Sequence, residues 1–121
     1  MSDLSEALRF DSLQIIGSAA APAANAQIGT SLATPAAGVY EVSVVTLLNG
    51  GAPVAADLDN MYLAFNGTSK TLMVVPAQNV PAINPVFRIT LDGTHNVSVN
   101  AAANATAGVT YAVVAWLKRV A

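Results

Sequence analysis

The chain holds one histidine, His95, which lies three residues after Asp92 in the stretch LDGTHN. An imidazole in this setting could act as a general base. A base of this kind needs an oriented nucleophile, and the sequence has no cysteine and no GxSxG motif. We therefore interpret His95 as an exposed turn residue, and we expect no catalytic residues and no enzyme activity.

A second group of polar residues occurs in the stretch AADLDNMYL, where Asp57, Asp59 and Asn60 offer oxygen ligands. A calcium loop of the EF type would need a further oxygen ligand at Met61 and a glutamate at Thr68. Neither is present, so the pattern favours a turn in which Asp and Asn side chains bond to the backbone. We expect no metal and no cofactor.

Four aromatic residues could together form a platform that stacks on a sugar: Tyr40, Tyr62, Tyr111 and Trp116. Aromatic residues make up only 6% of the chain, and each of these four lies within a strand pattern. Packing in a core or an interface is therefore the favoured interpretation.

The composition indicates a protein that covers its surface with partners. Its 121 residues suffice for one domain; 54% are apolar and 10% charged, against about 25% charged in a typical soluble domain. The formal net charge is −2, so no basic surface is present to track a nucleic acid. Lys118 and Arg119 are too few for a basic patch and are expected to keep the chain end solvated. We expect homo-oligomers and no nucleic-acid partner.

Membrane and secretory segments are not expected. No stretch approaches the roughly 20 consecutive apolar residues of a spanning helix. The first sixteen residues have no continuous apolar core, because Asp3, Glu6 and Asp11 interrupt them.

Residues 1–36 are predicted to form an extended amino-terminal arm. Asp3 could cap a short helix in which Leu4 and Leu8 share one face. The stretch GSAAAPAANAQIGTSLATPAAG is rich in small residues and has no sustained period, although QIGTSLA within it could be a short edge strand. We expect the arm to anchor the protein on a partner and to lie outside the core.

Residues 37–121 are predicted to form an all-β sandwich of the jelly-roll or Greek-key type. Stretches of β-branched and aromatic residues are separated by Gly, Pro, Asn and Asp, which is typical of short strands and turns. The turn sequence NGTS predicts a hairpin over 61–76. The strands are expected near 39–48, 61–66, 70–75, 86–91, 95–100 and 109–118.

A second hairpin is predicted around Asp92. A three-residue loop that starts there would set Phe87 opposite Val99. It would also set Ile89 opposite Val97, which places the apolar residues of both strands on one face. A two-residue loop would oppose them to polar residues, so the longer loop is expected.

The closing strand is apolar on both faces. Tyr111 and Trp116 are five positions apart and therefore point to opposite sides of a strand. Tyr111 is predicted to face the core, because its neighbours on that face are uniformly apolar. The other face is predicted to be an interface with the arm or a second subunit, formed by Trp116, Ala112, Val114, Leu4 and Leu8.

Three stretches carry a resemblance to a known group of proteins: PAAGVYEVSVVTLL, ADLDNMYL and ATAGVTYAVVAWLKRV. Over residues 35–121 the chain resembles small structural proteins of tailed-bacteriophage virions, namely jelly-roll proteins that decorate capsids or form head fibres. The resemblance implies a non-enzymatic capsid decoration (cement) protein, made in the cytoplasm of a bacterial host and located in the virion. Its implied partners are its own copies, as a trimer, and the major capsid protein or another virion protein.

The alternative is a module of a phage fibre or tail that binds a host surface or a glycan. Exposed loops would then have to converge on the ligand. The candidates are the loops over 49–60 and 76–85, together with His95.

Overall fold

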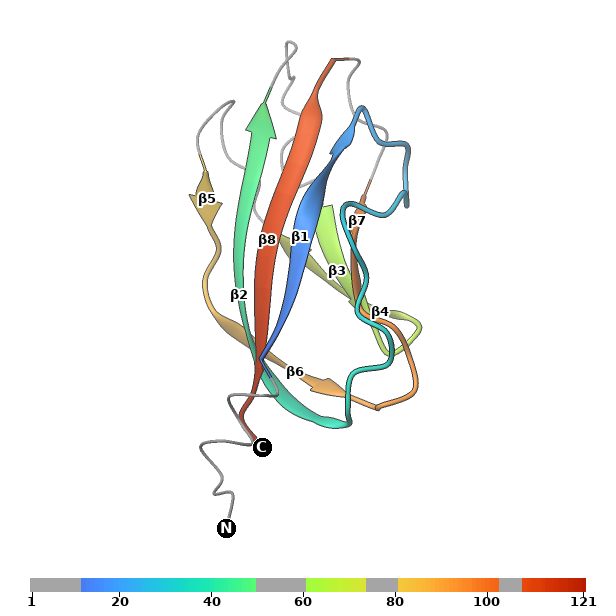
Figure 1. The fold of residues 1–121 in the computed structure, drawn as a ribbon, viewed down its shortest axis with the longest axis vertical. Helices are drawn as coiled ribbons and strands as arrows, with labels where there is room; N and C mark the ends of the chain where they lie inside the picture. The colour runs from blue at the N-terminus through green and yellow to red at the C-terminus, as the bar shows by residue number, and fades with distance from the viewer. Residues whose placement is uncertain (1–11, 50–60, 74–80, 103–107) are drawn as a thin grey trace.

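The computed structural model describes residues 12–49, 61–73, 81–102 and 108–121, and within these ranges the chain forms strands and no helix. Eight strands make two antiparallel sheets that face each other (Figure 1). The predicted all-β sandwich is confirmed. Strong β-formers occupy the long central strands, as in GVYEVSVVTLLN and TYAVVAWLKR.

Sheet A contains the longest strands of the molecule. Its order is β1-β8-β2-β5, and β6 continues along the edge of β2 that β5 begins to cover. Strand β8 is central and pairs with β1 on one side and β2 on the other. The strands are β1 (Ser12–Ala20), β2 (Gly38–Asn49), β5 (Ala82–Ile83), β6 (Phe87–Leu91) and β8 (Thr110–Arg119).

Sheet B is shorter and has the order β4-β3-β7. The predicted hairpin from Met61 is confirmed: β3 and β4 pair with Phe65 opposite Ser69, and three residues form the turn. The turn begins at Asn66, which has a positive φ of 53°. The strands are β3 (Met61–Phe65), β4 (Ser69–Met73) and β7 (Ser98–Ala101).

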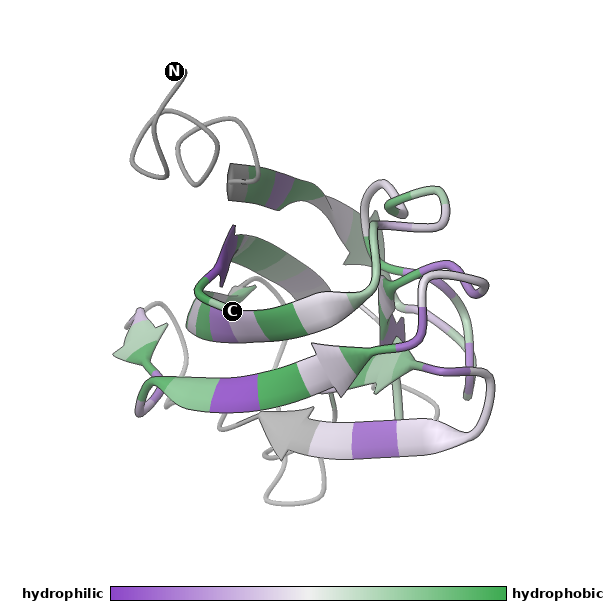
Figure 2. Cartoon of the chain, turned by 90° about the horizontal axis from the view of Figure 1, so that it is seen from below, coloured by the Kyte–Doolittle hydropathy of each residue, from purple (hydrophilic) through white to green (hydrophobic). Residues whose placement is uncertain are grey.

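The core fills the space between the two sheets. Side chains alternate along each strand, so every second residue points inward. Coloured by hydropathy, strands of both sheets carry hydrophobic positions with isolated hydrophilic ones between them (Figure 2). The largest fully buried side chains are Tyr40, Tyr111, Ile15, Ile28, Leu48, Met61, Leu63, Leu117, Val42, Val44 and Val97.

The predicted arm is wrong for residues 12–36, which belong to the sandwich. Strand β1 pairs along its whole length with β8. The chain then crosses to sheet B, where the Ile28 N–H donates to the Val99 carbonyl at 2.7 Å, and Leu32 forms a bridge with Val97. Ile15 and Ile28 are fully buried. Pairing with β8 and β7 orders this stretch, and Ile15 and Ile28 enter the core, whereas Ile16 of β1 is exposed.

Small residues are needed where this crossing segment passes β1. A Cβ added to Gly17 would lie 2.3 Å from the Gly29 Cα, which is closer than real Cβ contacts come. Backbone therefore packs directly on backbone at this point. The small residues of this stretch, which suggest low-complexity chain in the sequence, are needed for this close packing.

The predicted hairpin between the strands at 86–91 and 95–100 is also wrong. Strand β6 pairs with β2 in sheet A, whereas β7 pairs with β3 in sheet B. Ile89 and Val97 are both buried, as expected, but they approach the core from opposite sheets. The segment that starts at Asp92 is thus a corner between sheets. The Asn66 side chain holds it by accepting from the Asp92 N–H at 3.0 Å and donating to the Thr90 carbonyl at 2.8 Å.

A candidate interface on the outer face of sheet A

The His95 imidazole and the Asp92 carboxylate form an exposed pair at the corner between the sheets. His95 Nδ1 lies 2.7 Å from Asp92 Oδ2 and 3.1 Å from Thr94 Oγ1. In a catalytic triad the acid and the nucleophile contact different ring nitrogens. Here both groups contact Nδ1, so the ring cannot be held by the acid while it activates the hydroxyl. The arrangement is that of a structural turn.

Hydrogen bonds stabilise the ionised form of Asp92. The Thr94 N–H donates to Asp92 Oδ1 at 2.9 Å, and this bond is the main cause that lowers the pKa of the carboxyl group. The contact with His95 lowers the pKa further, and desolvation opposes both.

The structure adds little on metals and membranes. The candidate ligands Asp57, Asp59 and Asn60 lie outside the described residues. Among the described residues, no three His, Cys, Asp or Glu side chains gather as a metal site would require. The same part of the chain contains no helix with the length and apolarity to span a membrane.

The four aromatic candidates do not converge on one surface. Tyr40 and Tyr111 are buried in the core. Tyr62 is nearly buried, its hydroxyl donates to Asn25 Oδ1 at 2.9 Å, and Lys70 Nζ lies 4.7 Å from the centroid of its ring. Of the four, Trp116 alone is exposed, with 44% of its surface accessible. These side chains therefore offer no stacking platform for a glycan.

Trp116 lies on the outer face of sheet A. Tyr111 is fully buried on the inner face of the same strand, so the predicted assignment of the two faces is confirmed. Beside Trp116, Gln14 of β1 and Ser43 of β2 occupy the paired positions. We define the outer face by the outward residues of its strands: Gln14, Ile16, Ser18, Ser43, Val45, Leu47, Ile83, Ala112, Val114 and Trp116.

One row of this outer face is apolar across four strands. Ile16 pairs with Val114, Val114 pairs with Val45, and Val45 pairs with Ile83. Ile16 and Ile83 are 53% and 83% exposed. Cross-strand neighbours on one face lie about 5 Å apart, so these four side chains form a continuous apolar band beside Trp116.

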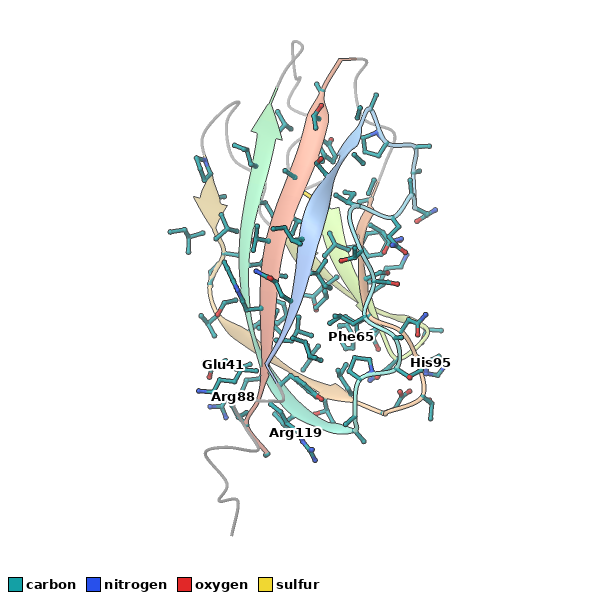
Figure 3. All side chains as sticks on the ribbon, viewed as in Figure 1. Glu41, Phe65, Arg88, His95 and Arg119 are labelled. Atoms are coloured by element: carbon teal, nitrogen blue, oxygen red, sulfur yellow. The ribbon has the colours of Figure 1, made fainter. Side chains whose placement is uncertain are left out.

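A charged row borders the outer face at its lower end. Lys118 pairs with Glu41, and Glu41 pairs with Arg88. Arg88 Nη2 lies 3.5 Å from Glu41 Oε2, and both side chains are solvent-accessible. Figure 3 shows this pair together at the lower end of the sheet. The row carries one acidic and two basic groups, so its net charge is positive.

The outer face of sheet B is polar by contrast. Asn100 Nδ2 donates to the Asn25 carbonyl at 3.0 Å, and Ser98 Oγ donates to Asn100 Oδ1 at 2.6 Å. Lys70 covers Tyr62 on the same side. The sandwich therefore presents two chemically different outer faces.

Three of the predicted interface residues, Ala112, Val114 and Trp116, share the outer face of sheet A, and their contact with a partner stays a prediction. Leu4 and Leu8 lie outside the described residues. Sequence analysis missed Ile16 and Ile83, which extend the apolar band. Ile16 could have been found from the alternation of Gln14, Ile16 and Ser18 along β1. Ile83 could not, because β5 has only two residues and shows no alternation.

Comparisons with known proteins agree with the fold. No protein-family model matches the chain, and no curated protein matches it. Among solved structures, it is similar to a chain of the "acidic stable capsid structure of Helicobacter pylori bacteriophage KHP30", with a TM-score of 0.51 and 13% identity over 88% of this chain and 86% of that one. A second similar structure is "PRD1 vertex protein P5", with a TM-score of 0.46 and 15% identity over 91% and 96% of the two chains. The expected resemblance to phage virion proteins is thus confirmed in the fold.

Proposed function

We propose that this protein is a capsid decoration (cement) protein, a non-enzymatic component of a phage virion. It binds the assembled head as a homo-oligomer, a trimer, in contact with the major capsid protein or another virion protein. The fold shared with a chain of a phage capsid structure supports a virion role.

The difference between the two outer faces carries the proposal. The largest apolar patch on a soluble protein, typically about 300–600 Å², is often a functional surface. The band around Val114 is therefore expected to be covered in the assembled particle, while the polar face with Lys70 and Asn100 meets solvent. Surface buried only in the assembled state stabilises that state by mass action.

The test compares phage particles that have and lack this chain. Particles that lack it should release their DNA at a lower temperature, and added wild-type protein should restore the release temperature. The variant Ala112→Asp, on the central strand of sheet A, should fail to restore it. The matched control is Ala64→Asp, on the central strand of sheet B, which should restore it fully. Particles whose release temperature does not depend on this chain would rule out the cement role.

A further inference from the structure

The outer face of sheet A needs an occupant, and its size limits the choice. At about 4.8 Å between strands and about 6.8 Å between rows, the face covers roughly 300–400 Å². Two such faces packed together would bury roughly 600–800 Å² in total. A stable interface buries more than about 1,000 Å². A contact confined to this face, whatever covers it, is therefore too small by itself for a stable oligomer, so each subunit must make more than one such contact.

Residues 1–11 have the chemistry that fits this face. The segment MSDLSEALRFD places Leu4 and Leu8 four residues apart, as one side of a helical turn would. These side chains match the apolar band of Ile16, Val114 and Val45. Eleven residues extend about 16 Å as a helix or about 36 Å as extended chain, so the segment can cover the face in either form.

The charges are complementary as well. The segment carries Asp3, Glu6 and Asp11 against Arg9, so its side chains are net acidic. The charged row beside Trp116 is net basic. Opposite charges at the rim of an apolar contact fix its orientation.

The path of the chain favours a neighbouring molecule over the same one. Strand β1 starts at Ser12, which pairs with Lys118 at the charged end of the sheet. Extended chain that precedes Ser12 leads past this end, and a return to its own face needs a sharp reversal. The first sixteen residues contain no glycine or proline, so a reversal there would depend on Asp11 and Ser12.

We infer that residues 1–11 of a second copy dock on the outer face of sheet A, with Leu4 and Leu8 against Trp116 and the apolar band. This inference rests on the homo-oligomer in the proposed function and names its contact. Each subunit then donates its amino-terminal segment to one neighbour and receives one from another.

Disulfide trapping tests the contact, and the chain has no natural cysteine to interfere. A chain with Leu8→Cys is mixed with a chain that carries Ser43→Cys, whose position neighbours Trp116. Mild oxidation should give a covalent dimer of the two variants. The matched control replaces Ser43→Cys with Ala64→Cys, on the polar face of sheet B, and should give at least ten-fold less dimer.

Three results would overturn the inference. An intrachain disulfide in the double variant Leu8→Cys/Ser43→Cys, without dimer in the mixture, would place the segment on its own face. Dimers of Ser43→Cys with itself would indicate packing of two faces. No disulfide in the mixture or in the double variant would indicate that another protein covers the face.

The outcome separates this inference from the proposed function. Trapped dimers together with an unchanged DNA-release temperature would retain the contact and reject the cement role. A lowered release temperature in particles without the chain, but no trapped dimer, would retain the cement role and reject the contact.

Discussion

Tyr111 and Trp116 lie on opposite faces of β8, and only Tyr111 contributes to the core. The Tyr111 side chain is fully buried between the sheets, whereas 44% of Trp116 is exposed on the outer face. The same strand thus contributes to the core with one side and to the candidate interface with the other. This division separates the effects of substitutions at the two positions.

Tyr111→Ala should lower the free energy of unfolding by about 3–5 kcal/mol, because it leaves a large cavity in the core. Trp116→Ala should lower it by less than about 1 kcal/mol in the dissociated chain, because its side chain is partly solvated there. Urea unfolding followed by circular dichroism measures both without the tryptophan signal. Equal losses for the two variants would contradict the assignment of faces.

A chain that starts at Ser12 should fold, whereas a chain that starts at residue 37 should not. The shorter chain lacks β1 and the crossing segment, which leaves one edge of β8 unpaired and removes Ile15 and Ile28 from the core. Near-ultraviolet circular dichroism and amide dispersion in NMR spectra report the packed state. A folded 37–121 fragment would restore the view that residues 12–36 are an accessory arm.

Gly17→Ala should destabilise the fold by about 1–3 kcal/mol, because the new methyl group meets the backbone of Gly29. Ser18→Ala is the control: it lies on the exposed side of β1 and should change the stability by about 0.5 kcal/mol at most. Thermal unfolding of both variants measures the difference. Equal stability would mean that the crossing segment moves aside at no cost.

Acid should remove the stabilising effect of the Asp92 carboxylate. Its pKa is lowered in the folded chain, so its contribution is fully present above the ordinary value of 3.8 and is lost as the pH falls through the folded pKa. Asp92→Asn cannot ionise and should lose less stability than the wild type between about pH 5 and about pH 2.5. Urea midpoints at these two pH values provide the measurement. Identical losses would show that the Thr94 and His95 contacts do not favour the charged form.

The sequence pattern predicts the strands with large alternating side chains and fails where small residues replace them. Tyr111 and its inward neighbours mark β8 clearly, and the Asn66-Gly67 turn marks the β3–β4 hairpin. In β1 the inward positions include Gly17 and Ala19, whose low hydrophobicity conceals the alternation. The segment that pairs with β7 is short and interrupted, and only its QIGTSLA stretch indicates an edge strand.

Pairing partners are harder to predict than faces. The alternation in β6 and β7 correctly places Ile89 and Val97 inward. In a sandwich, however, both sheets direct their apolar residues to the same core, so the pattern is the same whether the two strands are neighbours or lie across from each other. The predicted hairpin directs the apolar residues of both strands to the core, but it pairs β7 with β6 of sheet A, whereas β7 pairs with β3 of sheet B.

The central position of β8 has a consequence for synthesis. Among the described strands β8 is synthesised last, yet β1 and β2 have no partner on their inner edges until it inserts between them. Leu13, near the start of the chain, pairs with Leu117, near its end. Such distant pairings slow folding and keep strand edges open meanwhile. Sheet A therefore forms only once β8 has been synthesised, and a nascent chain without β8 exposes the edges that favour aggregation.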